Sequence, residues 1–224
     1  MRKPKTLLVL VGCVLAAAAL VPLFTRDGEP RYQGRPLSEW LVIYSQSRTT
    51  QNSPGRDEAV QAIRSIGTNG LPYLTKWIRH EPPLWWRPLR KLGLFPARLI
   101  QGPGQERAFG AMLAFGILGT NAASAIPELN TMINDTNHPW TSVRALQALG
   151  SLGPPAFPHI VAAISNTNQP HRARIVLYLG LTMADAVGTN QCLPPLMAAL
   201  NDPDPEVRST ARQLLGRFTN APAQ

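Results

Sequence analysis

The stretch GTNGLP at residues 67–72 returns twice in altered form, as GTNAASAIP at 119–127 and as GTNQCLP at 188–194. Glycine lacks a Cβ and suits the left-handed cap that ends a helix. Proline is tolerated in the first turn of a helix, where the backbone N–H has no partner within the helix. We therefore expect one helix to end at each glycine and another to begin near each proline. An oxygen in the linking stretch can cap the second helix; the candidate caps are Asn69, Asn121, Ser124 and Asn190.

From residue 57 onward, successive segments carry one apolar stripe each, and the first three stripes are followed at once by Gly67, Gly119 and Gly153. Apolar residues recur there at i, i+3, i+4 and i+7, which is the spacing of a single helix face. Alanine at the first two positions lets a neighbouring helix approach closely. The stripes are Ala59, Ala62, Ile63 and Ile66; Ala111, Ala114, Phe115 and Leu118; Ala145, Ala148, Leu149 and Leu152; Ala211, Leu214, Leu215 and Phe218; and a degraded copy, Ile175, Tyr178, Leu179 and Thr182.

The segments that follow the glycines are also alike. They read LPYLTKWI, IPELNTMI, FPHIVAAI and LPPLMAAL, and each is apolar at the same four places. The repeating unit is therefore a helix, a glycine turn and a second helix. Units of this kind bury their apolar faces only against their neighbours. The sequence predicts an all-α fold, an α-solenoid of helix pairs.

The stretch LPPLMAALNDPDPEVRSTARQLLG at 193–216 resembles a HEAT repeat, especially the short HEAT-like repeats of the phycobilisome lyase type. The resemblance extends over about residues 57–219, and it implies an α-solenoid of HEAT-like helix pairs. In that family an Asp and an Arg of each repeat form a ladder between repeats. Here the Asp position is occupied by Asp135, Asn166 and Asp202, and the Arg position by Ser142, Arg172 and Arg208.

The N-terminus has the pattern of a membrane signal. A basic cluster at residues 2–5 precedes the uncharged, mainly apolar run 6–24, which as a helix would span about 28 Å, close to the thickness of a hydrocarbon core. An uncleaved signal-anchor, a signal peptide cleaved near Ala17 and lipidation at Cys13 all fit this pattern. Each places residues 25–224 outside the cytoplasm. The expected protein is single-pass, with its C-terminal domain periplasmic or on the cell surface, or is secreted after cleavage.

These patterns divide the chain into successive parts. We expect a signal-anchor or signal peptide at 1–24, a tether at 25–35, a covering helix with a loop at 36–56, a HEAT-like repeat domain at 57–219 and a tail at 220–224. The repeat domain contains an insertion at 81–104, whose five prolines forbid one long helix.

The net charge of +9 is concentrated in parts of the chain. Residues 76–98 carry more Lys and Arg than Asp and Glu, whereas residues 123–206 are acidic overall. Nucleic acid is therefore an improbable partner. Within the insertion, tryptophans stand beside basic residues, a combination suited to docking on a protein partner or a membrane surface. This candidate docking patch comprises Trp85, Trp86, Arg87, Arg90 and Lys91.

An extended solenoid face is the second candidate binding surface. Its candidate residues are Arg107, Arg144, Gln147, Arg174, Arg208 and Arg212. The sequence offers no catalytic, cofactor or metal motif: the four histidines lack partners at i+3 or i+4, and Cys192 fits a quiet thiol. We therefore expect a non-catalytic scaffold for an unidentified protein partner. The resemblance also implies two enzymatic alternatives, a bilin-type prosthetic-group lyase and a HEAT-like DNA-binding enzyme such as a glycosylase.

Overall fold

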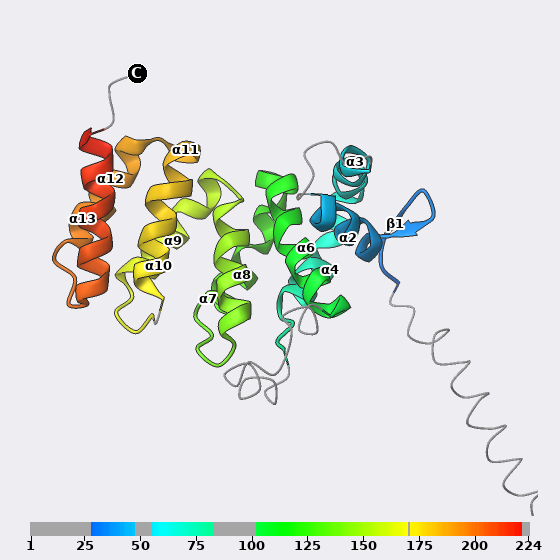
Figure 1. Cartoon of the computed structure of the whole chain (residues 1–224), viewed down its shortest axis with the longest axis horizontal. Helices are drawn as coiled ribbons and strands as arrows, with labels where there is room; N and C mark the ends of the chain where they lie inside the picture. The colour runs from blue at the N-terminus through cyan, green and yellow to red at the C-terminus, as the bar shows by residue number, and fades with distance from the viewer. Residues whose placement is uncertain (1–27, 48–54, 83–101, 170, 221–224) are drawn as a thin grey trace, which may run out of the picture.

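The computed structural model describes residues 28–47, 55–82, 102–169 and 171–220. In this part of the chain the fold is an all-α solenoid, which confirms the expected fold class. The helices stand side by side in chain order, from α2 (Leu37–Ser47) near one end to α13 (Pro205–Asn220) at the other (Figure 1). The apolar run 6–24 and the docking patch at 85–91 lie outside the described residues, so both stay predictions.

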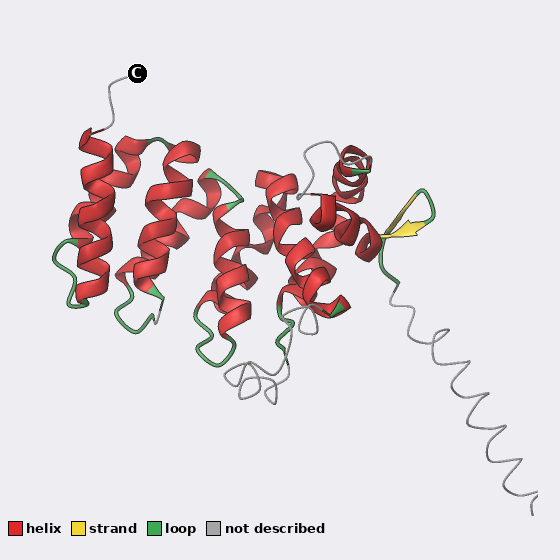
Figure 2. Ribbon diagram, viewed as in Figure 1, coloured by secondary structure: helices red, strands yellow, loops and turns green. Residues whose placement is uncertain are grey.

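A short β-hairpin precedes the solenoid (Figure 2). Strands β1 (Arg31–Tyr32) and β2 (Arg35–Pro36) pair antiparallel. Trp40 of α2 donates a 3.3 Å hydrogen bond to the carbonyl of Tyr32, and the guanidinium of Arg35 lies 5.2 Å from the centre of the Trp40 ring. The prediction of a tether at 25–35 is therefore wrong from residue 28 onward, because this part of the segment packs on α2.

The helices form closely packed pairs that stack along the solenoid. In each pair the two helices are joined by the longer loop, whereas the glycine turn links one pair to the next. This corrects the expected unit, in which the glycine turn lay inside the pair. The pairs are α2 with α3 (Arg56–Ile66), α4 (Leu71–Ile78) with α6 (Pro103–Leu118), α7 (Ile126–Ile133) with α8 (Pro139–Gly150), α9 (Phe157–Ser165) with α10 (Arg172–Tyr178), and α12 (Thr189–Ala199) with α13.

The glycines end their helices as expected. Gly67 has φ 57° and ψ −137°, Gly119 has φ 53° and ψ −133°, and both N–H groups donate to the carbonyl four residues earlier. Gly153 has similar dihedral angles, φ 75° and ψ −148°, but α8 ends earlier, at Gly150, and a two-residue turn separates it from Gly153. A positive φ combined with an extended ψ is more restrictive than the left-handed helical region, because it is nearly confined to glycine. These positions therefore require glycine.

The helices that follow the glycine turns begin in part differently from the prediction. Short 3-10 helices, η1 (Gly67–Gly70) and η3 (Gly119–Ala125), lead directly into α4 and α7, and neither α4 nor α7 has a side-chain cap in the described structure. The expected asparagine and serine caps at these two helices are therefore wrong. Pro72 and Pro127 do lie in the first turns of α4 and α7. Pro194, however, lies inside α12, which begins earlier, at Thr189.

The apolar stripes supply the core. The stripes of α3, α6 and α8 are buried throughout, with exposed fractions between 0% and 7%. Burying a large aliphatic or aromatic side chain of this kind contributes about 1.5–3 kcal/mol relative to leaving it exposed. Gly110 lets α6 approach α2, since a Cβ there would lie 2.8 Å from the backbone oxygen of Leu41.

The fourth repeat departs from the others where the sequence is longer. A π-helical turn, η5 (Leu179–Met183), continues α10 and leads into the short helix α11 (Ala184–Val187). The wider π turn accommodates an additional residue within a helix. Gly180 in this turn allows close approach to α13, because a Cβ there would lie 2.7 Å from Leu214. The turn also places Leu181 on the surface, where it is 43% exposed.

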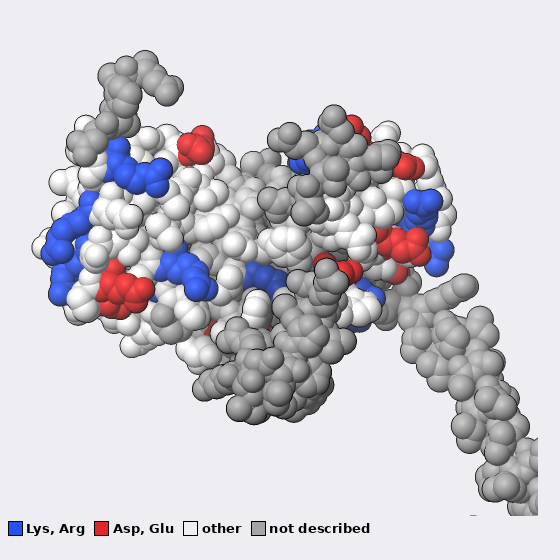
Figure 3. Space-filling view, viewed as in Figure 1, with Lys and Arg blue, Asp and Glu red and all other residues white. Residues whose placement is uncertain are grey.

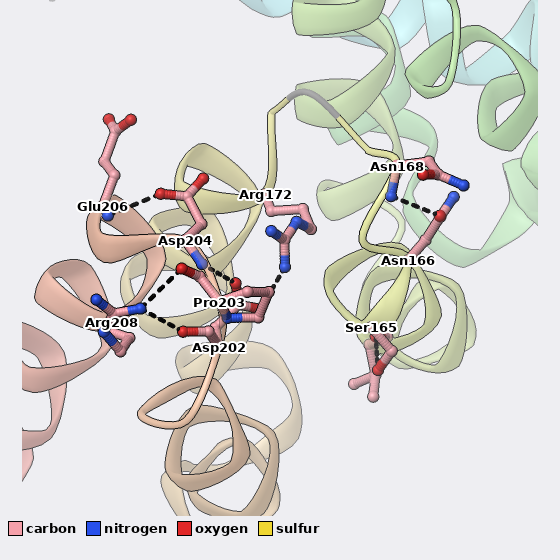
Figure 4. A network of polar contacts seen from close by, with 10 residues as sticks. Ser165, Asn166, Asn168, Arg172, Asp202, Pro203, Asp204, Glu206 and Arg208 are labelled. Atoms are coloured by element: carbon pink, nitrogen blue, oxygen red, sulfur yellow. Dashed lines mark hydrogen bonds and ion pairs between the residues drawn. The ribbon is translucent and has the colours of Figure 1, made fainter.

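One rung of the expected ladder is present among the described residues (Figure 4). The guanidinium of Arg172 donates to the carboxylate of Asp202 in the following repeat, and both side chains are largely buried. Arg208 instead donates to the backbone carbonyls of Asp202 and Pro203, at 2.6 and 2.8 Å. The hydroxyl of Ser142 donates to the carbonyl of Ile133. An ionic link therefore joins the fourth pair, α9 with α10, to the fifth pair, α12 with α13. Other contacts replace it elsewhere in the described structure.

One helical stretch, Pro103–Ile133, has the length and hydropathy of a membrane span among the described residues. It comprises α6, η3 and α7, and half of its most apolar window is buried inside the protein. Its apolar character is explained by its place in the solenoid core. It therefore gives no evidence for membrane attachment.

Candidate functional site

Two adjoining grooves lie on the face formed by α3, α6, α8 and α10. The first, which we call the basic groove, has a volume of about 540 Å³. Two arginines of α3 and several hydroxyl and amide groups lie along it. The lining residues are Tyr44, Arg56, Val60, Arg64, Met112, Leu113, Gly116, Ile117, Gln147, Ser151 and Tyr178.

The second groove, which we call the leucine groove, lies between α8 and α10 and has a volume of about 440 Å³. Leu177 and Leu181 expose 39% and 43% of their surface beside it. Large apolar side chains exposed close together are typical of interaction surfaces. The lining residues are Val143, Leu146, Gln147, Arg174, Leu177, Tyr178, Leu181 and Thr182.

The grooves meet at Gln147 and Tyr178, which line both of them. The ring of Tyr178 lies on Gly150, where a Cβ would come within 1.9 Å of the ring carbon Cε1. Its hydroxyl donates a 3.3 Å hydrogen bond to the carbonyl of Gln147. The wall between the grooves is thus fixed by the absence of a side chain at Gly150.

Gly116 forms part of the floor of the basic groove. A Cβ at this position would lie 3.7 Å from Cβ of Ser151, an ordinary contact distance. The backbone of Gly116 does not require glycine, because its φ is not positive. A larger side chain here would therefore fill the groove without disturbing the core.

The grooves carry positive charge. Arg64 and Arg174 are exposed and Arg56 is half-buried, while no Asp or Glu lines either groove within the described residues. Asp57 lines a neighbouring hollow that shares Val60 and Arg64 with the basic groove. In the face seen in Figure 3, basic side chains form separate patches among mainly uncharged atoms. Separate patches differ from the continuous basic stripe of a nucleic-acid-binding surface.

The expected solenoid-face residues fall into different environments. Gln147 and Arg174 are exposed and line the grooves. Arg107 is half-buried over the ring of Trp77, 5.5 Å from its centre. Arg208 is half-buried and bonded to its own loop, and Arg212 is exposed on α13.

Arg144 corrects the expectation of a partner-binding residue, because only 4% of it is exposed. It donates hydrogen bonds to the carbonyls of Ile78 and His80, at 2.6 and 2.7 Å, and to the side chain of Gln105 at 3.0 Å. Burial lowers the pKa of its guanidinium, and the nearby Glu81 carboxylate opposes that shift. Arg144 therefore links α8 to the two segments that flank residues 83–101.

Contacts around Arg144 strengthen this link. The carboxylate of Glu81 accepts a 2.7 Å hydrogen bond from the N–H of Thr141, in the first turn of α8. The ring of His80 lies against Gly104, where a Cβ would be 2.6 Å away. Burial, together with the charge of Arg144, lowers the pKa of His80. The two ends of the insertion expected at 81–104 therefore lie close together, beside the first turn of α8.

Several groove residues were not expected from the sequence. Arg56 and Arg64 are eight residues apart on α3 and share a helix side with Val60. Leu177 and Leu181 are four residues apart and lie outside the core stripe of α10. This pair of leucines outside the buried stripe is the sequence feature from which the leucine groove could have been predicted.

Cys192 is buried, and burial raises the pKa of its thiol. Its Sγ lies 3.8 Å from the carbonyl oxygen of Leu179. A raised pKa disfavours the thiolate form that nucleophilic cysteines need. These properties fit the expected quiet thiol.

Stacked helix pairs with an extended grooved face define a helical repeat protein of the solenoid class. A sequence model of HEAT repeats matches residues 157–224, which include α9, α10, α12 and α13. This match supports a HEAT-repeat protein, and HEAT repeats suggest a protein-interaction scaffold. Comparison with curated proteins and with solved structures finds no match.

Proposed function

We propose that this protein is a non-catalytic scaffold that holds a partner protein along the basic and leucine grooves. The observation that carries the proposal is the exposure of Leu177 and Leu181 beside the leucine groove. Exposed leucines that border a groove gain free energy when a partner covers them. A preformed groove reduces the entropy lost on binding, and α8 and α10 form this groove, with the ring of Tyr178 packed on Gly150.

The proposal includes display outside the cytoplasm. It is supported by the basic cluster at 2–5 and the uncharged run 6–24, which have the charge order of a signal-anchor. A phosphatase fused to the C-terminus of the full chain should be active in the periplasm or medium and inactive in the cytoplasm. Full-length chain that is soluble in the cytoplasm would contradict this topology.

Site-specific crosslinking tests the binding face. A photoreactive amino acid at Leu181, irradiated in native membranes, should give a discrete crosslinked product of higher mass. Met197 offers a matched control position, since it is 59% exposed but lies on α12, away from the grooves. Equal crosslinking from both positions would show that contact is unspecific and would contradict the proposal.

A further inference from the structure

We infer that the occupant of the two grooves is an extended protein segment with acidic residues at one end and apolar residues at the other. This inference rests on the proposed function and adds the chemistry of the partner. The two ends correspond to the two grooves. The basic groove takes the acidic end, and the leucine groove takes the apolar end.

The charge of the residues that line the basic groove favours acidic residues in the part of the partner that binds there. Arg56 and Arg64 border the basic groove, and no carboxylate lines it within the described structure. An arginine guanidinium binds a carboxylate through paired hydrogen bonds, so that two arginines on one helix suit an acidic segment. A basic segment would meet the like charge of these two arginines in the same groove.

The apolar residues that line the leucine groove favour apolar side chains in the other end of the partner segment. Val143, Leu177 and Leu181 line the leucine groove, and among the described residues Arg174 is the charged residue that lines it. A segment whose apolar side chains cover these leucines removes apolar surface from water on both partners. An acidic residue in that end would lose hydration and gain contact with one arginine alone.

The dimensions and polar groups favour an extended chain. The combined grooves cross from α3 over α6 and α8 to α10, and neighbouring helix axes lie about 8–10 Å apart, which gives roughly 24–30 Å. An extended segment of about eight or nine residues covers this length. The exposed amide of Gln147 lies where the grooves meet and can bond an extended backbone. A helical occupant would satisfy its own backbone and would need apolar lining along the whole path.

Fluorescence anisotropy with defined peptides tests this inference on the full chain in nanodiscs of zwitterionic lipid. The probe is a labelled decapeptide with four glutamates in one half and two leucines in the other, made in both chain directions. One comparison peptide has glutamine in place of glutamate, and another has serine in place of leucine. In at least one direction, the parent peptide should bind about tenfold more tightly than either comparison peptide.

Variants assign the two ends to the two grooves. The double change Arg56→Gln with Arg64→Gln should weaken the acidic peptide about tenfold and leave the glutamine peptide unchanged. The double change Leu177→Ser with Leu181→Ser should weaken the parent peptide and leave the serine peptide unchanged. Arg79→Gln and Met197→Ser are matched controls, because both residues are exposed and line neither groove.

Three results overturn the inference. They are equal affinity for the acidic and glutamine peptides, equal affinity for the leucine and serine peptides, and equal weakening by the groove variants and their controls. The first two results come from the unaltered protein, so misfolding of a variant cannot produce them. If these results accompany specific crosslinking at Leu181, the partner chemistry is wrong and the scaffold function stands. If crosslinking at Leu181 is also unspecific, both are wrong.

Discussion

Arg144 of α8 donates a 2.6 Å hydrogen bond to the carbonyl oxygen of Ile78 at the end of α4, although 66 residues separate them in the sequence. The same guanidinium reaches Gln105 in the first turn of α6. One side chain thus joins both helices of a pair to the next pair along the solenoid. Coupling between neighbouring pairs is what makes a solenoid unfold cooperatively.

Replacing Arg144 should therefore be costly. Arg144→Met leaves the carbonyls of Ile78 and His80 without this donor, and we expect a loss of about 3 kcal/mol of unfolding free energy. For a chain of this size that loss lowers Tm by roughly 6–12 °C. Thermal melts followed by circular dichroism measure it. Arg212→Met is the control, because Arg212 is exposed and, like Arg144, lies on the second helix of its pair; it should change Tm little. An equal fall in Tm for the two variants would contradict the role assigned to Arg144.

The rung between Arg172 and Asp202 should show strong energetic coupling. Both side chains are about 90% or more buried, and removing one partner leaves the other charge uncompensated. A double-mutant cycle with Arg172→Met and Asp202→Asn should give a coupling energy above about 1 kcal/mol. The exposed pair Arg79 and Glu128, with side chains 49% and 45% exposed, is the control and should couple by less. Equal coupling in the two cycles would show that the rung contributes no more than a surface ion pair.

Two glycines three residues apart should respond oppositely to alanine. Gly119 has φ 53° and ψ −133°, so Gly119→Ala should cost about 1–3 kcal/mol. Gly116 is helical, with room for a Cβ, so Gly116→Ala should stabilise by about 0.5–1 kcal/mol. Denaturant unfolding measures both changes. A stabilising Gly119→Ala would contradict the assigned helix end.

Acidic pH should destabilise the solenoid through two histidines. Burial is the main cause that lowers the pKa of both His80 and His171, assisted by Arg144 and Arg174 respectively, while Glu81 opposes the shift at His80. As the pH falls, these histidines bind protons in the unfolded chain before they do so in the folded chain. Their contribution to the free energy of unfolding is therefore present above about pH 6.5 and is lost as the pH falls below that value. Tm should fall between pH 7.5 and 5.5. The double variant His80→Gln with His171→Gln should show a smaller fall, and an unchanged fall would contradict this origin.

The helix ends and buried stripes could be predicted because they depend on local chemistry. The stripe that includes Ala145 and Leu149 follows from helical spacing, and the glycine stops follow from backbone geometry that other residues rarely adopt. The pairing of helices across loops depends on contacts between distant segments. The environment of Arg144 could not be predicted for the same reason, since its acceptors at Ile78 and His80 lie more than 60 residues away and Gln105 lies 39 residues away.

The grooves depend on the spaces between helices, which no single segment encodes. Arg174 and Gln147 could be proposed from the sequence as face residues, and both line a groove. The contribution of Gly150 could not be anticipated, because it consists in making room for the ring of Tyr178 from the neighbouring pair. The π-helical turn that presents Leu181 could not be anticipated either, and its Gly180 makes room for Leu214 of α13.

Filling the basic groove tests whether one partner occupies both grooves. Gly116→Leu should fill this groove, whereas Gly116→Ala should leave most of it open. We expect both variants to fold, because Gly116 is exposed and a Cβ there makes only ordinary contacts. The measurement is the yield of the crosslinked product from a photoreactive group at Leu181 in native membranes. Our account predicts that the yield falls at least about tenfold in Gly116→Leu and is retained in Gly116→Ala. Equal yields from the two folded variants would contradict the claim that one partner occupies both grooves.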